Sequence, residues 1–334
     1  MTKIGVIGYG TIGKRVSDAV LLQNDMKLVG ITGNSYNYKI EVAKKKGIKI
    51  FSADKVGEDL KKNNIYLSGN IYDLVKECDV VVDCTPKGVG QKNKETYLSY
   101  DKKAIFQGGE SLEVADTSFV AQCNYNQSIN KDYIRVVSCN TTGLCRTLHA
   151  VDKQYGIDNV HATIIRRAAD PWDIYHGPIN SIVPVLELPS HHGPDVRTVL
   201  PEFSVFTTAM TVPTTIMHVH SVTVDLKNPA TYEDVIELFR NTTRIKVVRN
   251  SEKIRSTAEI IEFAKDLGRP RGDMPETCVW DKAIGTWGNK LFYLQAVHQE
   301  SNVVLETIDA IRAAMGFPSA QESIKKTNES MGIN

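Results

Sequence analysis

The stretch KIGVIGYGTIGKRV, residues 3–16, decides the fold of the first half of the chain. An apolar strand over residues 4–7 runs directly into Gly8, Gly10 and Gly13, and a helical pattern follows over residues 12–22. In a βαβ unit the first glycine permits a tight turn, the second lets a pyrophosphate approach the backbone, and the third allows close helix–strand packing. The N–H groups at the helix start face the phosphates. The stretch therefore predicts a dinucleotide-binding turn.

Outward from this stretch, short buried strands alternate with helical patterns as far as residue 137. The expected strands cover residues 26–31, 80–83, 103–106 and 133–137. Strands that alternate with helices imply right-handed crossovers and parallel pairing. We therefore expect an α/β fold in which residues 1–138 form a dinucleotide-binding domain with a Rossmann-type, doubly wound parallel sheet.

The pattern changes after Cys139. Longer strands rich in β-branched residues follow one another, with few helices between them, over residues 160–166, 203–212, 216–226, 245–248, 277–281 and 290–297. Consecutive strands favour antiparallel or mixed pairing. Residues 139–302 are therefore expected to form an α+β catalytic domain with a mixed or antiparallel sheet.

Composition excludes several classes of protein. The chain has 334 residues, which suggests two domains, and its 40 Lys and Arg against 39 Asp and Glu give a net charge of +1. No basic excess points to nucleic acid, and six cysteines are too few for a disulfide scaffold. The uncharged residues 203–224 are better explained by two strands than by a membrane span, and the strand at residue 4 argues against a signal peptide. We expect a cytoplasmic protein.

The end of the second expected strand bears on the choice of nicotinamide cofactor. An acidic residue there would bind the ribose 2′-hydroxyl and repel a 2′-phosphate, but residues 29–35 read VGITGNS. NADP should be tolerated through Thr32, Asn34 and Ser35. No Arg or Lys stands in the turn to favour it. Use of both NAD and NADP is the expectation.

The sequence SCNTTG, residues 138–143, holds the best-placed cysteine. Cys139 lies between an expected strand and a helix expected from Thr142, where the helix N-terminus should lower the pKa of the thiol and favour thiolate. A thiolate beside a nicotinamide cofactor adds to an aldehyde, and loss of hydride then leaves a thioester for water or phosphate to cleave.

Histidines and arginines supply the other candidate groups. His218 and His220 alternate along one strand and share a face, so either could be the catalytic base. The pair could instead bind a metal, but the sequence shows no third ligand, and we expect no metal site. His192 follows a proline-rich loop and could donate to a phosphate. Arg166 and Arg167 are candidate anion-binding groups.

Several sequence blocks in one order resemble the archaeal-type, class II phosphorylating glyceraldehyde-3-phosphate dehydrogenases over nearly the whole chain. The blocks are GYGTIGKR at 8–15, FQGGE at 106–110, VVSCNTTG at 136–143, RRAADP at 166–171, PSHHGPD at 189–195, PTTIMHVH at 213–220 and QAVHQES at 295–301. The resemblance implies reversible oxidation of D-glyceraldehyde 3-phosphate with NAD(P) and inorganic phosphate to 1,3-bisphosphoglycerate, in glycolysis or gluconeogenesis. It also implies a homotetramer. The C-terminal helices, about residues 303–334, are expected to pack back on the first domain.

The resemblance also assigns roles to individual residues. Cys139 matches the nucleophile and His218 the catalytic histidine, with His220 as its rival. Substrate-contacting positions are Ser138, Asn140, His192 and Gly193, with Thr141 beside them. Cofactor-contacting positions are Thr11, Ile12, Gly109, Arg167 and Gln299, together with the turn glycines Gly8, Gly10 and Gly13. The family commonly has Lys where this chain has Gly33, so no preference for NADP is inferred.

Two other functions are compatible with parts of the sequence. A semialdehyde or acyl-phosphate dehydrogenase of the aspartate-semialdehyde type also uses a cysteine after a dinucleotide domain, but SCNTTG joined to His191 and His192 favours the first interpretation. A non-catalytic Rossmann-fold binding protein, possibly for RNA, is disfavoured by the near-zero charge and the intact set of candidate reactive residues.

Overall fold

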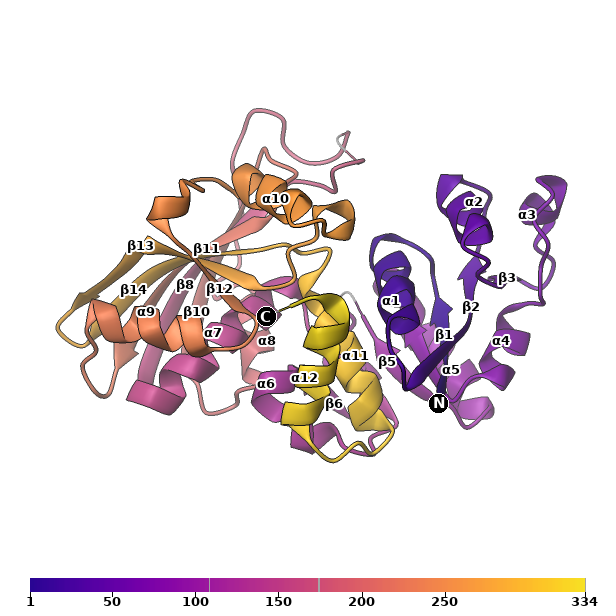
Figure 1. Cartoon of the computed structure of the whole chain (residues 1–334), viewed down its shortest axis with the longest axis horizontal. Helices are drawn as coiled ribbons and strands as arrows, with labels where there is room; N and C mark the ends of the chain where they lie inside the picture. Colours follow the sequence, from indigo (N-terminus) through magenta and orange to yellow (C-terminus); the bar gives the residue numbers. More distant parts are fainter. Residues whose placement is uncertain (108, 174, 334) are drawn as a thin grey trace. The chain divides into compact units, whose positions relative to one another are not determined.

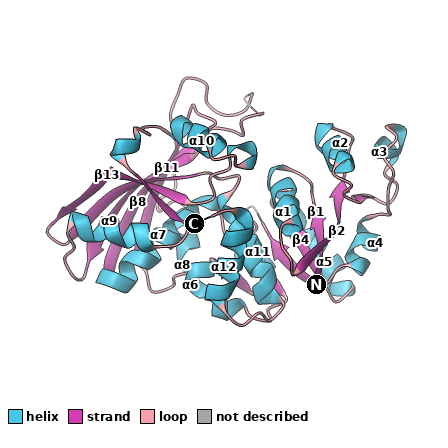
Figure 2. Cartoon of the chain, in the orientation of Figure 1, coloured by secondary structure: helices cyan, strands magenta, loops and turns pink. Residues whose placement is uncertain are grey.

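The computed structural model describes residues 1–107, 109–173 and 175–333. The chain forms two compact units, one of Met1–Ser138 with Val304–Ile333 and one of Cys139–Val303. Figure 1 traces the chain and Figure 2 its helices and strands.

The first unit is built on a wholly parallel sheet with the strand order β3-β2-β1-β4-β5-β7-β6. Its strands are β1 (Thr2–Ile7), β2 (Met26–Gly33), β3 (Ile50–Ser52), β4 (Val80–Asp83), β5 (Lys103–Phe106), β6 (Thr117–Phe119) and β7 (Tyr133–Val136). All four residues of β4 are buried, because both faces of the sheet are covered. The order reverses beside β1, so the expected doubly wound Rossmann-type sheet is confirmed.

Helices connect these strands. They are α1 (Thr11–Leu21), α2 (Tyr38–Lys45), α3 (Glu58–Lys62), α4 (Ile71–Glu77), α5 (Val89–Ser99) and α6 (Ala121–Asn124). The C-terminal helices α11 (Asn302–Ala314) and α12 (Ala320–Met331) follow the last strand of the chain and belong to this unit from Val304 onward. The α4 helix begins at a capping box in which Asn70 and Asp73 satisfy each other's backbone N–H groups. Among the described residues, no helix combines the length and apolar character needed to cross a membrane.

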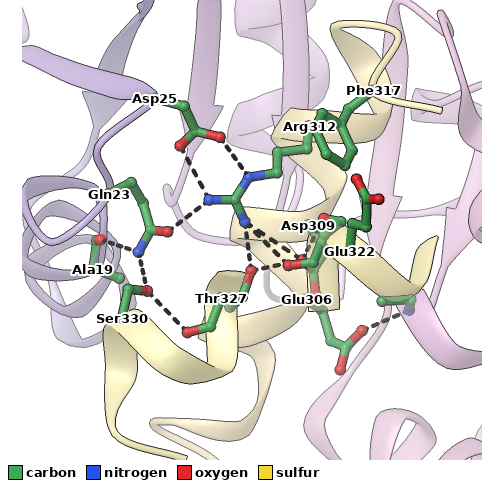
Figure 3. A network of polar contacts seen from close by, with 12 residues as sticks. Ala19, Gln23, Asp25, Glu306, Asp309, Arg312, Phe317, Glu322, Thr327 and Ser330 are labelled. Carbon is green, nitrogen blue, oxygen red and sulfur yellow. Dashed lines mark hydrogen bonds and ion pairs between the residues drawn. The ribbon is translucent and has the colours of Figure 1, made fainter. Parts of the chain in front are cut away.

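The two C-terminal helices join the first unit through a buried arginine. The Arg312 guanidinium donates to both carboxylate oxygens of Asp25 at 2.8 and 3.0 Å, and to the side-chain oxygen of Gln23 at 2.7 Å (Figure 3). Its other amino group donates to Thr327 on α12 at 2.7 Å. We call these residues, with Asp309, the Arg312 cluster. It ties α11 and α12 to the turn between α1 and β2.

The second unit carries a mixed sheet with the strand order β12-β13-β14-β11-β8-β10-β9. Its strands are β8 (Ile157–Arg167), β9 (Val183–Pro184), β10 (Val205–Val212), β11 (His218–Leu226), β12 (Ile245–Val248), β13 (Thr277–Trp287) and β14 (Lys290–Val297). The pairs β8–β10 and β12–β13 are parallel, whereas β11 is antiparallel to both β8 and β14. This confirms the mixed sheet predicted for the second half.

Helices cover the two faces of this sheet. The helices are α7 (Cys139–Tyr155), α8 (His192–Arg197), α9 (Tyr232–Asn241) and α10 (Thr257–Asp266). Gly143 of α7 lies over Val297 of β14, whereas Ile260 and Ala264 of α10 pack in a cluster with Ala296. Because neighbouring residues of a strand point to opposite faces, α7 and α10 lie on opposite sides of the sheet. The side chains of Gln295 and Val297 therefore face α7.

Candidate active site

The glycine turn after β1 has the close packing that its spacing predicts. Gly8 adopts a φ of +88°, and its N–H donates to the Thr32 hydroxyl at 2.9 Å. A Cβ on Gly13 would lie 1.9 Å from the Gly8 carbonyl oxygen, so only glycine lets α1 approach the turn. A Cβ on Gly10 would meet no atom within 4 Å. The turn thus leaves open space at the start of α1, which fits a dinucleotide phosphate.

The structure gives Thr32 a different role from the expected contact with NADP. Its side chain is buried and its hydroxyl is the acceptor for Gly8, so it holds the glycine turn and does not face a ribose. Asn34 and Ser35 are exposed directly after β2 and keep their candidate role. Thr11 and Ile12 open α1 as expected.

A second turn of the first unit contains Gly109, whose φ is +86°. The following Glu110 is 3% exposed, and its carboxylate accepts the N–H groups of Gly88 and Gly90 at 2.8 and 3.0 Å. Glu110 therefore fixes the start of α5. Gly108 of the same block lies outside the described residues.

Three consecutive residues in the first turn of α7 are held by side chains from other segments. The Cys139 carbonyl accepts a hydrogen bond from Asn302 at 2.9 Å, and the Thr141 hydroxyl donates to Asp195 at 2.6 Å. Between them, the Asn140 side chain lies 3.2 Å from His192 Nε2 and 2.9 Å from His220 Nε2. α7 begins at Cys139, three residues before the expected Thr142, so the cysteine is part of the helix start. Ser138, the preceding residue, is half-buried.

The expected lowering of the thiol pKa at Cys139 is wrong for this structure. Burial raises the pKa of the Cys139 thiol to about 12, and the nearby Glu300 carboxylate acts in the same direction. The Arg167 guanidinium, the Asn140 main-chain N–H and the Arg166 guanidinium lower the pKa but do not outweigh burial. The expectation from its place at a helix N-terminus therefore overestimated how acidic the Cys139 thiol is.

His218 begins β11, directly after Met217, which has a left-handed backbone with a φ of +58°. The main-chain N–H of Arg167 donates to His218 Nδ1 at 2.9 Å, so the neutral ring carries its proton on Nε2. Burial holds the pKa of His218 well below its usual value, and the charges of His220 and Arg167 act in the same direction. His218 is therefore a neutral hydrogen-bond donor at neutral pH.

His220 lies on the same face of β11 but is differently engaged. It is fully buried, with Nδ1 2.9 Å from the Gln295 side-chain nitrogen and Nε2 2.9 Å from the Asn140 side-chain oxygen. Burial lowers the pKa of His220 to about 3. With both ring nitrogens occupied, His220 is poorly placed to exchange a proton with substrate. The structure therefore favours His218 over His220 for a role at the substrate, as a hydrogen-bond donor and not as a base.

His192 and Gly193 lie at the start of α8. His192 is 1% exposed, and Ser190 Oγ lies 3.2 Å from its Nδ1. The Gly193 N–H donates to the Thr207 hydroxyl at 2.9 Å, and a Cβ on Gly193 would lie 2.8 Å from the Val205 carbonyl oxygen. Burial lowers the pKa of His192 to about 3, and the neighbouring His191 contributes. His192 is thus a neutral side chain.

Arg167 lies in a buried cluster of charged groups. Its guanidinium contacts the Asp170 carboxylate and lies 3.4 Å from a Glu300 oxygen. Glu300 also lies 2.9 Å from His298 Nε2. Burial works to raise the pKa of Glu300, but the His298 hydrogen bond and the charges of His298 and Arg167 leave it at about 2. Gln299 donates to Asp170 at 3.5 Å, which brings two predicted cofactor-contacting residues to one carboxylate.

Several residues of this site carried no chemical signal in the sequence. Asp195, Asn302 and Gln295 hold the turn around Cys139, yet they are single polar residues whose partners lie 54, 163 and 75 positions away. Only the resemblance blocks contained Asp195 and Gln295, and none contained Asn302. Among the described residues, no group of three His, Cys, Asp or Glu side chains is arranged to hold a metal ion.

The fold and site define a class of protein: an α/β oxidoreductase with a dinucleotide-binding unit and a second unit that carries a cysteine at a helix start. Residues 138–288 match the family model described as the C-terminal domain of glyceraldehyde 3-phosphate dehydrogenase. Residues 2–109 match the model described as the N-terminus of dihydrodipicolinate reductase.

Curated relatives identify the family. The glyceraldehyde-3-phosphate dehydrogenase of Pyrococcus furiosus is 53% identical over 332 residues, covering 99% of this chain and 98% of the relative. Those of Thermococcus onnurineus and Methanococcoides burtonii are 52% and 50% identical, each over 99% of this chain and over 98% and 99% of the relative. The chain belongs to the glyceraldehyde-3-phosphate dehydrogenase family. It is an enzyme that uses a nicotinamide cofactor.

Proposed function

We propose that the chain catalyses the reversible, phosphorylating oxidation of D-glyceraldehyde 3-phosphate to 1,3-bisphosphoglycerate, in glycolysis and gluconeogenesis. The family supplies the reaction class. The observation that supports the mechanism is the position of Cys139 in the first turn of α7, near the Arg166 and Arg167 guanidinium groups. The next residue, Asn140, is held by hydrogen bonds to two histidines.

The cofactor is held at the glycine turn of the first unit. Gly8, Gly10, Thr11, Ile12 and Gly13 would hold its pyrophosphate at the start of α1, and the open space at Gly10 supports this assignment. Gly109, Arg167 and Gln299 are the further cofactor-contacting residues that we propose. When bound, the cofactor accepts the hydride. The absence of both an acidic and a basic residue in the turn after β2 supports use of both NAD and NADP.

Cys139 is the nucleophile in this proposal. Its sulfur, as thiolate, adds to the aldehyde carbon, and oxidation of the resulting thiohemiacetal leaves a thioester that phosphate cleaves. The Arg166 and Arg167 guanidinium groups and the Asn140 N–H favour the thiolate against the effect of burial. His218, with its proton on Nε2, suits hydrogen-bond donation to the thiohemiacetal oxygen.

The anionic parts of the substrate would be held near the start of α8. Ser138, Asn140, Thr141, His192 and Gly193 are the substrate-contacting residues that we propose. Arg166 supports this assignment because its Nε is buried and has no hydrogen-bond partner among the described residues. A guanidinium group with an unused donor is suited to a phosphate oxygen.

The experiment that tests this function is cofactor reduction with glyceraldehyde 3-phosphate, with and without inorganic phosphate. Wild type should turn over only when phosphate is present, and Cys139→Ala should lose activity by roughly 10⁴-fold or more. Cys145→Ala, a buried cysteine of the same helix, is the matched control and should keep its activity. Undiminished turnover in Cys139→Ala would refute the mechanism, and turnover that ignores phosphate would refute the phosphorylating reaction.

We further propose a cytoplasmic homotetramer. The segment between β8 and α8 displays large apolar side chains, with Tyr175, Ile179 and Leu186 between 87% and 92% exposed. Burial of such side chains against another copy of the chain would stabilise an assembly. Light scattering of the purified protein should give four times the mass of 37.1 kDa, and a monomer mass would refute this assembly.

A further inference from the structure

A continuous run of buried side chains in the second unit leads from β14 to the start of α8 through the first turn of α7. Its members, in order of contact, are Tyr293, Thr147, Gln295, His220, Asn140, His192, Ser190 and Thr207. Neighbouring polar atoms are separated by 2.8–3.2 Å. All eight side chains are buried. We call this run the His220 chain.

The two amides give the His220 chain a direction. The Gln295 nitrogen can only donate, so His220 Nδ1 accepts and the ring proton is on Nε2, from which it donates to the Asn140 side-chain oxygen. The Asn140 side-chain nitrogen in turn donates to His192 Nε2. His192 therefore carries its proton on Nδ1, facing Ser190. Each ring is held as one neutral tautomer, and the two tautomers are opposite.

Both ends of the His220 chain are closed. At one end, the Tyr293 hydroxyl donates to the Thr147 hydroxyl at 3.0 Å, and Thr147 in turn donates to the Gln295 oxygen at 2.9 Å. At the other end, the Thr207 hydroxyl donates to the Ser190 carbonyl at 2.9 Å and accepts the N–H of Gly193. A proton added to either histidine would place two donors against each other in a buried site. The arrangement therefore holds together only when both rings are neutral.

The His220 chain passes through the residue that follows the nucleophile. Asn140 is in the first turn of α7, where main-chain N–H groups have no partner within the helix. Its main-chain N–H works to lower the pKa of the adjacent Cys139 thiol. On the sheet side, a Cβ on Gly143 would lie 2.4 Å from Val297 and 3.7 Å from the His220 ring, so this helix end also packs directly on β11 and β14.

We propose that His220 and Gln295 are positioning residues that hold Asn140 in one orientation and thereby keep its main-chain N–H directed at the Cys139 sulfur. Neither touches the reacting atoms, because both are fully committed to the His220 chain. The inference rests on the proposed function only in assigning Cys139 as the nucleophile. Its first two readouts, histidine tautomers and thiol reactivity, require no aldehyde turnover.

The first test measures the tautomers directly. Solid-state ¹⁵N NMR of histidine-labelled protein, with His192→Gln and His220→Gln to assign the signals, should show His220 protonated on Nε2 and His192 protonated on Nδ1. Both rings should stay neutral at pH 6. The reverse pair of tautomers would mean that the side-chain amides of Gln295 and Asn140 each have their oxygen and nitrogen exchanged. A charged ring would mean that one histidine faces an additional acceptor. Either result would overturn the assigned direction.

The second test measures the reactivity of Cys139 towards iodoacetamide at fixed pH, followed by mass spectrometry of its peptide. Gln295→Met and His220→Met remove the chain contacts at similar side-chain size and should slow the reaction roughly 3–10-fold. His220→Gln should restore the wild-type rate within about twofold, because a glutamine also accepts at one end and donates at the other.

Thr163→Val is the matched control. It removes the Thr163–Thr208 hydroxyl contact of 2.9 Å in the same sheet, outside the His220 chain, and should leave the alkylation rate unchanged. If His220→Met does not fold, Gln295→Met and the wild-type tautomers still decide the question. Equal alkylation rates in wild type, Gln295→Met and any folded His220→Met would refute the positioning role. Wild-type protein that shows the assigned tautomers but no aldehyde turnover would refute the proposed function alone.

Discussion

The Arg312 cluster of the first unit and the His220 chain of the second are both buried polar networks, but they are built from different chemistry. Arg312 is a permanent cation that faces Asp25 and lies 3.8 Å from the fully buried Asp309 (Figure 3). The His220 chain contains no charge, since burial holds its two histidines neutral. One network neutralises buried charges, and the other orders neutral donors and acceptors.

The difference indicates what each network can contribute. Removing one member of a buried ion pair leaves an uncompensated charge, which costs far more than an interrupted hydrogen bond between neutral groups. A neutral chain of amides and imidazoles, in turn, fixes direction, because each member must both accept and donate. The charged cluster anchors two helices, whereas the neutral chain is suited to orienting a reactive residue.

Replacement of His218, the histidine for which we propose a catalytic role, should have the largest effect. His218→Asn should lower kcat by roughly 10²–10⁴-fold, the range for loss of a general acid or base, because the donor at Nε2 is removed. His220→Asn should reduce kcat less, since His220 acts only through Asn140. Steady-state cofactor reduction measures both. A larger loss in His220→Asn would reverse the assignment of the two histidines.

Breaking the charged cluster should affect stability and leave the chemistry unchanged. Arg312→Met leaves Asp309 and Asp25 without their cation and should lower the free energy of unfolding by about 3–5 kcal/mol, measured by urea denaturation. The matched control is Arg249→Met, which removes an exposed pair with Glu252 and should cost less than about 1 kcal/mol. The kcat of folded Arg312→Met should equal that of wild type, and a selective loss of kcat would contradict the separation of roles.

The two networks should lose their contributions to the free energy of unfolding at different pH values. His192 and His220 have folded pKa values of about 3, below the ordinary 6.5, so the unfolded chain binds more protons as the pH falls below 6.5. Their stabilisation is present above that pH and is lost towards pH 3, by roughly 1 kcal/mol per pH unit for each histidine. Urea unfolding from pH 7 to 5 should show this slope, reduced in His220→Gln. An unchanged slope in that variant would mean that His220 titrates normally.

The Arg312 cluster should respond at lower pH. Burial works to raise the pKa of Asp25, but the hydrogen bond and charge of Arg312 leave it below the ordinary 3.8. The stabilisation from this carboxylate is therefore complete above that value and is lost only as the pH falls below it. In wild type, the loss between pH 7 and 5 thus belongs to the histidines.

Loosening one contact of the α7 turn should have the smallest effect. Thr141→Val removes the hydroxyl that donates to Asp195 at 2.6 Å and should lower the free energy of unfolding by about 1 kcal/mol. The KM for the aldehyde should rise by up to about fivefold, the equivalent of roughly 1 kcal/mol, because the proposed contact of the Thr141 hydroxyl with the substrate is also lost. An unchanged KM would contradict that contact and would leave Thr141 only its hydrogen bond to Asp195.

Local patterns in the sequence were enough to predict much of the fold. The GYGTIG turn after an apolar strand predicted the dinucleotide-binding geometry, because the positive φ of Gly8 and the close contact at Gly13 each depend on neighbouring residues. Alternating strands and helices predicted the parallel sheet. The placement of His218 and His220 on one face followed from the two-residue period of a strand.

The pKa of the Cys139 thiol is a property that local sequence patterns did not predict. A helix N-terminus is a local feature that a sequence can indicate, and it favours thiolate. Burial depends on every segment that surrounds the thiol, and here it raises the pKa to about 12. The same limit applied to Thr32, whose hydroxyl was predicted to face the cofactor but instead holds Gly8.

The sequence by itself determined the class of fold, the dinucleotide turn and a cysteine between a strand and a helix, because these depend on residues close together along the chain. Only the tertiary structure distinguished the two histidines of β11. His218 and His220 lie on the same face of one strand, so the sequence pattern does not separate them. They differ because the Arg167 main-chain N–H bonds one nitrogen of His218, whereas Gln295 and Asn140 occupy both nitrogens of His220. Those partners come from three separate segments. Long-range contacts of this kind leave no periodic pattern in a single sequence.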